Sequence, residues 1–174
     1  LSLRRQRQMC IRDRCYCFNP NARNGHTLEG VVSQLTETGK QYADHGIAFS
    51  FHNHTDSMMG TLDECRQLCD LLDPKVCGLT FDTAHAAACG MTDLDAAVQT
   101  LKSHITNVHL KDLNDAGKFC PLGTGKLPLA DTVRALQRIN FNHWLVVDEE
   151  SANVECEEAC RISMDFLKAN GLTV

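Results

Sequence analysis

The sequence predicts an α/β fold in which parallel strands alternate with helices. Short apolar runs are separated by segments with helical periodicity of about 10 to 15 residues, which is the pattern of βαβ units. Several runs are almost continuously apolar, as expected of strands covered on both faces. Four of these runs end on a histidine or an aspartate, where a barrel of parallel strands places its active site.

The expected elements follow one another in regular order. Five strands are expected at residues 15–18, 47–51, 76–81, 105–110 and 144–147. Helices are expected at residues 27–45, 61–72, 92–101, 129–139 and 155–169, with a longer loop at 111–126. Thr27 and Thr61 are suitable N-caps, Gly46 suits the position after a helix end, and Pro74 follows the second helix.

The composition is that of an ordinary globular domain. The 174 residues are 43% hydrophobic and 22% charged, enough for one compact core. No apolar run approaches the roughly 20 residues of a membrane span, and the N-terminus lacks the apolar stretch of a signal peptide. We therefore expect a cytoplasmic protein that does not act at a membrane.

The first segment, residues 1–14, differs from the rest. It holds five of the 17 basic residues and only one of the 22 acidic ones. The run MCIRDR resembles a translated sequencing-library adapter, so we expect residues 1–14 to be a non-native or disordered segment. A basic arm for nucleic acid is the alternative. Without this segment 12 basic and 21 acidic residues remain, a balance of −9 that disfavours binding to a phosphate backbone.

Ten cysteines are present, and two pairs have i,i+4 spacing: Cys65 with Cys69, and Cys156 with Cys160. No pair of C-x-x-C motifs indicates a zinc ribbon. Cysteines at this spacing on a helix usually serve as small buried hydrophobic residues, which is the reading we prefer. A cysteine metal or redox site is the alternative.

The strand ends predict a metal site. Four strands run directly into His52, Asp82, His109 and Asp148, and the carboxyl ends of parallel barrel strands open on one face. A nitrogen and oxygen set suits Mn²⁺, Co²⁺, Zn²⁺ or Fe²⁺ better than Mg²⁺. Taken singly, each histidine could be a hydrogen-bonded surface residue and Asp82 could cap a turn. Their recurrence at strand ends favours one bound divalent ion.

Several motifs also resemble a known family. These are FHNH (51–54), FDTAH (81–85), NVHLKD (107–112), LGTG (122–125) and WLVVDEES (144–151). Together they resemble the sugar phosphate isomerase/epimerase family, which has the xylose isomerase-like TIM barrel. The resemblance runs from Gly25 to the end and covers the second half of the barrel. It implies that residues 15–174 form an incomplete barrel, with about five of eight strands, that is inactive on its own.

The resemblance also implies roles for individual residues. In the epimerases the ligands are Glu, Asp, His and Glu; Asp82 and His109 match the middle two, whereas His52 and Asp148 replace the glutamates. Whether Asp148 or Glu150 is the fourth ligand stays open.

Around the expected metal, the resemblance assigns His85 and Lys111 to catalysis and to binding substrate oxygen atoms. The simpler interpretations are that His85 is a core or supporting histidine and that Lys111 is a solvated loop lysine. Asp112 would bind substrate or orient its neighbours. His54 would bind substrate as well, since it shares a strand face with His52 if the extended conformation continues, and Glu150 would be the mobile acid/base.

The implied reaction is proton abstraction beside a carbonyl of a sugar or keto-sugar, as in an isomerase or epimerase. An inosose-dehydratase-like lyase is the alternative. A non-catalytic, degenerate sugar-binding barrel is a further one. A DNA-repair endonuclease on the same barrel would need a basic groove, which the acidic balance disfavours. The expected partner is a small sugar or cyclitol; homo-oligomerisation is left open.

Overall fold

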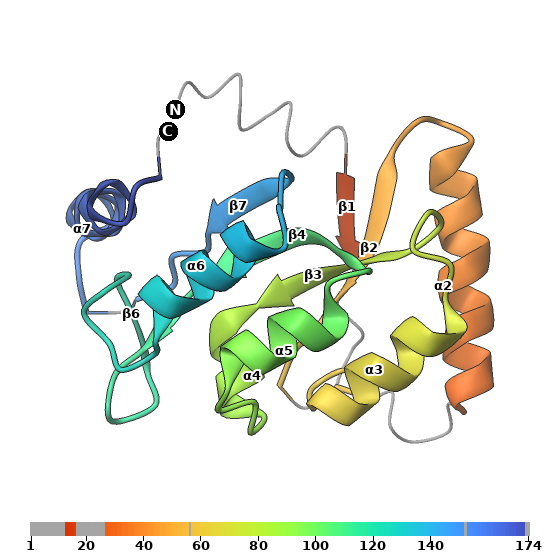
Figure 1. The fold of residues 1–174 in the computed structure, drawn as a ribbon, viewed down its shortest axis with the longest axis horizontal. Coiled ribbons are helices and arrows are strands. Elements are labelled where there is room, and N and C mark those ends of the chain that lie inside the picture. Colours follow the sequence, from red (N-terminus) through yellow and green to blue (C-terminus); the bar gives the residue numbers. More distant parts are fainter. Residues whose placement is uncertain (1–12, 17–26, 56, 152, 173–174) are drawn as a thin grey trace.

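The computed structural model describes residues 13–16, 27–55, 57–151 and 153–172. Its main feature is a parallel sheet of five strands in the order β1-β2-β3-β4-β7 (Figure 1). The strands are β1 (Asp13–Tyr16), β2 (Ala48–His52), β3 (Gly78–Asp82), β4 (Ile105–Leu110) and β7 (Trp144–Val147). Because a closed barrel of this type has eight strands, the described part is a partial (β/α) barrel, as the sequence predicts.

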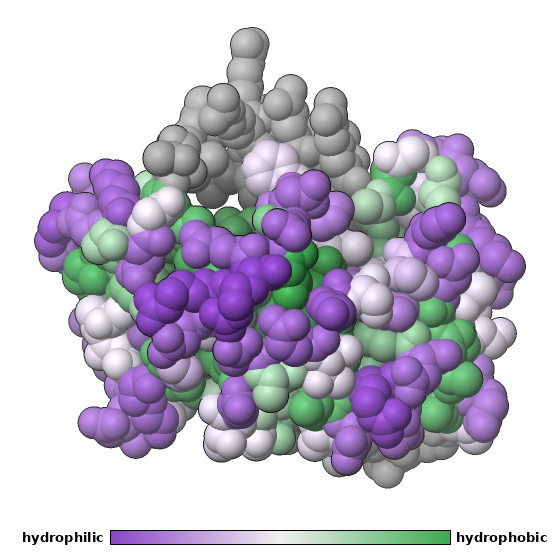
Figure 2. Space-filling model, viewed as in Figure 1, coloured by the Kyte–Doolittle hydropathy of each residue, from purple (hydrophilic) through white to green (hydrophobic). Residues whose placement is uncertain are grey.

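The helices form the outer layer. They are α2 (Leu28–Ala43), α3 (Leu62–Leu71), α4 (Thr83–Ala88), α5 (Leu94–Leu101), α6 (Leu129–Arg138) and α7 (Cys156–Ala169). Helices α3, α5 and α6 lie along one side of the sheet (Figure 1). On this side of the molecule hydrophilic residues dominate, with smaller apolar areas between them (Figure 2). The apolar sides of the helices pack inward against strand residues such as Phe51, Leu79 and Val108.

The caps predicted from sequence are present. The Thr27 hydroxyl accepts a hydrogen bond from the backbone N–H of Gly30 at 3.1 Å. Thr61 and Glu64 form a reciprocal capping box at the start of α3. Gly46 follows α2 with a positive φ of 68°, a conformation that glycine adopts without steric cost. These local signals fix where α2 and α3 begin and where β2 can start.

Three features differ from the sequence expectation. Strand β1 begins at Asp13, so two residues of the segment predicted to lie outside the domain are in the sheet; residues 1–12 lie outside the described residues. Helix α4 follows β3 directly and was not predicted. The expected loop at 111–126 contains a small antiparallel pair, β5 (Asp112–Leu113) with β6 (Phe119–Cys120).

The two cysteine pairs behave differently. Cys65 and Cys69 are buried, and burial raises the pKa of both thiols, so they act as small hydrophobic residues as predicted. For Cys156 and Cys160 the prediction is wrong, because both are exposed on α7. The buried residues of α7 are Ala159, Ser163 and Leu167, a stripe that excludes both cysteines.

None of the helices in the described part of the chain is long and apolar enough to cross a membrane.

Candidate metal centre

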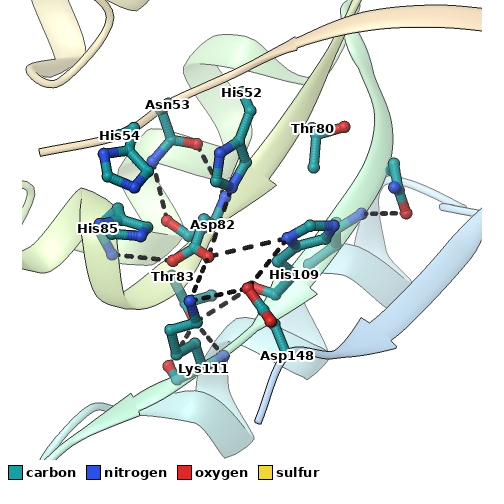
Figure 3. A network of polar contacts seen from close by, with 12 residues as sticks. His52, Asn53, His54, Thr80, Asp82, Thr83, His85, His109, Lys111 and Asp148 are labelled. Atoms are coloured by element: carbon teal, nitrogen blue, oxygen red, sulfur yellow. Dashed lines mark hydrogen bonds and ion pairs between the residues drawn. The ribbon is translucent and has the colours of Figure 1, made fainter. Parts of the chain in front are cut away.

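Three side chains meet at the carboxyl ends of neighbouring strands. His52 ends β2, Asp82 ends β3, and His109 lies one residue before the end of β4, opposite Asp82 in the parallel register. One potential ligand atom from each of the three lies within 4.8 Å of the others. Figure 3 shows the two imidazoles converging on the Asp82 carboxylate. The structure therefore brings together three of the four predicted ligands.

The Asp82 carboxylate is oriented by its surroundings. Its Oδ1 accepts the backbone N–H of His85 at 2.8 Å and so caps α4. Its backbone is fixed by the Asn53 side chain, which accepts the Asp82 N–H at 2.8 Å and donates to the Asp82 carbonyl at 2.9 Å. Oδ2 is left facing the imidazoles, 3.5 Å from His52 Nε2 and 4.0 Å from His109 Nδ1.

These atoms fit a metal ion. Asp82 Oδ2 and His109 Nδ1 are buried and have no hydrogen-bond partner of regular geometry among the described residues. Leaving buried polar atoms unsatisfied costs about 1–3 kcal/mol each, so a coordinating ligand for them is expected. Two imidazole nitrogens and one carboxylate oxygen suit Mn²⁺, Fe²⁺, Co²⁺ or Zn²⁺. Three protein ligands would also leave coordination positions on the ion open for substrate, as in catalytic metal sites.

Asp148, the fourth predicted ligand, lies at the edge of this cluster. It follows β7, and its Oδ2 is 3.4 Å from His109 Nδ1. The same oxygen is 2.8 Å from the Lys111 ammonium. Lys111 Nζ is also 3.3 Å from Glu150 Oε2 and 3.8 Å from Asp82 Oδ2. The buried Lys111 ammonium thus lies between the carboxylates of Asp82, Asp148 and Glu150.

The charges stabilise one another. Burial opposes ionisation of Asp82, but the neighbouring His52 ring, the His85 backbone and Lys111 together lower the Asp82 pKa. Contact with His109, supplemented by Lys111, lowers the pKa of Asp148 well below its usual range. Burial also opposes the charge of Lys111, yet the carboxylates raise its pKa. Near neutral pH the site therefore holds ionised carboxylates around an ammonium group.

His54 and His85 form a second imidazole pair beside the cluster. Their ring centroids are 3.8 Å apart, and each ring lies within 6 Å of the His52 ring, at 5.8 and 5.7 Å. His85 Nδ1 accepts hydrogen bonds from the Thr55 backbone at 3.5 Å and from the Thr55 hydroxyl at 3.3 Å. Burial lowers the pKa of His85 to about 4, so this ring is neutral with its proton on Nε2.

Glu150 and Asp112 occupy contrasting positions. The Glu150 side chain is 53% exposed, so its carboxylate can change position while remaining next to Lys111. Asp112 is fully buried, and its two oxygens accept backbone N–H groups from Leu113, Gly123, Gly125 and Leu127. Asp112 therefore holds the loop after β5 in place. Because both carboxylate oxygens of Asp112 accept backbone hydrogen bonds, we assign Asp112 no part in the substrate site proposed below.

Three supporting residues were not identified from sequence. Asn53 fixes the backbone of Asp82, and the Thr83 hydroxyl bonds both the N–H and the carbonyl of Lys111, at 2.9 and 2.7 Å. The Phe119 ring lies 4.6 Å from Lys111 Nζ and packs edge-on against His85. Asn53 and Thr83 could have been suspected from their places inside the FHNH and FDTAH motifs, whereas nothing in the sequence marks Phe119.

A partial barrel of parallel strands, with His52, Asp82 and His109 gathered at the carboxyl ends of the strands, defines a (β/α)-barrel protein whose functional site lies at that end and whose clustered side chains could hold a metal ion. Among such proteins, this chain belongs to the xylose isomerase-like TIM barrel family, whose model matches residues 13–170. The family predicted from the motifs is thereby confirmed.

Individual relatives share only a limited part of their sequence with this chain. An inosose dehydratase from Mesomycoplasma hyopneumoniae (strain J) is 26% identical over 190 residues, covering 97% of this chain and 61% of the relative. The crystal structure of a D-tagatose 3-epimerase-like protein superimposes with a TM-score of 0.75 at 18% identity, over 98% of this chain and 71% of that one. The IOLI protein, solved with a bound zinc atom, gives 0.70 at 18% identity, over 91% and 62%. The chain thus spans about 61% of the length of the inosose dehydratase that it matches.

Proposed function

We propose that the protein containing this chain is a metal-dependent lyase. It would remove the proton next to the carbonyl of an inosose or related keto-sugar and expel a β-hydroxyl as water. The observation that carries this proposal is the cluster of His52, Asp82 and His109, with Lys111 and His85 beside it. The inosose dehydratases among the relatives support dehydration over other outcomes.

The three clustered residues would hold one divalent ion, with Asp148 as the fourth ligand. Mn²⁺, Co²⁺, Zn²⁺ or Fe²⁺ suits this set better than Mg²⁺. When bound, such an ion would act as a Lewis acid on a substrate carbonyl, which would make the neighbouring C–H more acidic. The zinc found in the IOLI structure is compatible with this choice.

The other side chains would handle protons and charge. Glu150, exposed and adjacent to Lys111, takes the proton from carbon. The Lys111 ammonium stabilises negative charge on a substrate oxygen. His85, neutral and protonated on Nε2, donates a hydrogen bond to a substrate hydroxyl. His54, which packs against His85, would bind a further hydroxyl.

Isomerisation or epimerisation is the second candidate. It begins with the same proton removal and differs in where the proton returns, and Glu150 is placed to return it. The similar epimerase structures are under 25% identical, so they support the fold and leave the choice of reaction to experiment.

The test is solvent exchange in a full-length relative that retains these motifs. In heavy water, a panel of inososes and keto-sugars should gain deuterium on the carbon next to the carbonyl, measured by NMR. A chelator should stop the exchange. Glu150→Gln should slow it more than it weakens metal binding, whereas Glu157→Gln, at an exposed position on α7, should not.

The products distinguish the candidates. Loss of a hydroxyl indicates dehydration, and a rearranged sugar containing deuterium indicates isomerisation or epimerisation. Turnover without deuterium uptake would point to a hydride shift and would remove the role proposed for Glu150.

A further inference from the structure

The Lys111 side chain is buried and contacts three carboxylates. Its side chain is 2% exposed, and its ammonium lies within 4.0 Å of Asp82, Asp148 and Glu150. An ammonium is taken out of water at a high energetic cost, which only close opposite charges offset. The three carboxylates therefore hold a cation here in the metal-free protein.

The oxygen atoms that contact Lys111 are also those that face the imidazoles. Asp82 Oδ2 is 3.8 Å from Lys111 Nζ and 4.0 Å from His109 Nδ1. Asp148 Oδ2 is 2.8 Å from Lys111 Nζ and 3.4 Å from His109 Nδ1. A divalent ion ligated by His109 and these two carboxylates would share both oxygens with the ammonium.

We propose that Lys111 is a built-in counter-cation that competes with the divalent ion for Asp82 and Asp148 and so weakens metal binding. The proposal rests on the metal site described under the proposed function, and adds to it a residue that sets the affinity. Lys111 stabilises the carboxylates when no ion is bound, and gives up its contact with Asp148 Oδ2 when that oxygen becomes a ligand.

Electrostatics sets the size of the effect. Two positive charges a few ångströms apart at a partly buried site repel strongly, even with the high effective dielectric that proteins show. Removing the lysine charge should therefore tighten metal binding by about tenfold or more. The same removal leaves the carboxylates of the metal-free site without their cation, so the metal-free protein should become less stable.

Contacts of the Lys111 backbone leave only the side chain to move when the ammonium gives up Asp148. The Thr83 hydroxyl bonds the Lys111 backbone on both sides, and the chain passes directly into β5, where Asp112 is buried. The flexible methylene stem is thus the part that can move the ammonium, towards the exposed Glu150 carboxylate or towards a substrate oxygen.

The experiment compares Mn²⁺ affinity in the 174-residue chain by competition with a fluorescent chelator. Lys111→Met removes the charge and keeps the apolar stem. Lys118→Met is the matched control, because Lys118 is exposed in the β5–β6 hairpin that directly follows Lys111 and its loss changes the net charge equally. We expect Lys111→Met to bind about tenfold more tightly or better, and Lys118→Met to stay within about twofold of wild type.

Two further measurements test whether Lys111 affects metal binding through the carboxylates that it shares with the ion. In an Asp148→Asn background, the gain from Lys111→Met should shrink, because one of the shared oxygens no longer carries charge. In thermal unfolding, metal-free Lys111→Met should melt below wild type, and saturating Mn²⁺ should raise its melting temperature by more than it raises that of wild type. Lys111→Gln, refolded with Mn²⁺ present, serves if Lys111→Met does not fold.

Equal or weaker Mn²⁺ binding by the Lys111 variants, with wild type binding stoichiometrically, would overturn this inference and leave the metal site intact. If wild type and all variants bind no metal, the proposed function fails with it. Binding gained only in the Lys111 variants would support the competition directly.

Discussion

The side-chain amide of Asn53 pairs with the backbone of Asp82 in both directions, accepting its N–H at 2.8 Å and donating to its carbonyl at 2.9 Å. Asn53 comes directly after β2 and is fully buried. It thus bridges the ends of β2 and β3 at the point where His52 and Asp82 approach each other. The relative placement of these two predicted ligands depends on this one amide.

Replacing Asn53 by alanine should destabilise the fold and weaken metal binding together. Two buried backbone groups of Asp82 would lose their partners, which should cost about 2 kcal/mol or more. Urea unfolding measures the first effect and Mn²⁺ titration the second. Asn142→Ala, at an exposed position, should change stability by less than about 0.5 kcal/mol. Normal stability in Asn53→Ala would show that water replaces the amide without penalty.

Removing a ligand should abolish stoichiometric metal binding. Asp82→Ala and His109→Ala each take one donor from a small set, so both should fail to retain metal after gel filtration. Asp82→Asn separates ligation from helix capping, because the amide oxygen can still accept the His85 N–H. Asp115→Ala and His143→Ala, both exposed, are the controls. If both ligand variants keep the metal, the site lies elsewhere.

The metal-free protein should lose stability in mild acid through His85. Burial lowers the pKa of His85 from 6.5 to about 4, so the unfolded chain takes up this proton before the folded chain does. Stability is therefore full above pH 6.5 and declines as the pH falls towards 4. Between pH 7 and 5 the loss from this group should be about 2 kcal/mol.

Urea titrations in the presence of chelator test this. His85→Gln should flatten the decline, and His45→Gln, at an exposed position, should not. Equal pH dependence in wild type and His85→Gln would show that His85 is not the responsible group.

The open sheet should lead to self-association. In the described part β1 and β7 are the edge strands, and Trp144, the first residue of β7, is 44% exposed. Trp144 also lines an apolar hollow of about 170 Å³ near the start of the strands, together with Phe49 and Thr106. Unpaired edges beside apolar surface promote pairing between chains.

Light scattering of the 174-residue chain should therefore report dimers or larger species. Trp144→Lys should shift the distribution towards monomer. Leu71→Lys, which changes a similarly exposed apolar residue on α3, should not. A well-behaved monomer of the unmodified chain would contradict this view.

Much of the fold was predictable because its signals are local. The alternation of apolar runs and helical periods located all five strands to within two residues, and Thr27 and Thr61 marked helix starts through hydrogen bonds three residues away. The strand-end positions of His52, Asp82 and His109 followed from this pattern alone. Asp148 followed in the same way, although the structure places it beside Lys111, at the edge of the cluster.

What was missed depends on contacts between distant residues or on very short elements. Helix α4 has six residues, too few to show a period, and its cap is the last residue of a strand. The β5–β6 pair has two residues per strand and is held by the loop that Asp112 organises. The partner of Asn53 lies 29 residues further along the chain, and Phe119 reaches Lys111 through the fold. No periodicity encodes such pairings.

One oxygen of Asp82 caps α4 and the other is the proposed metal ligand, and this division limits how the proposed metal centre can be re-engineered. A histidine or cysteine introduced there to favour a softer metal would supply a donor atom, yet it would leave the first turn of α4 without its acceptor. Among short side chains only aspartate carries two oxygen acceptors, so no substitution at this position keeps both the helix cap and the proposed ligand atom. To favour a different ion, His52 and His109 are the better positions to substitute, because neither side chain caps a helix.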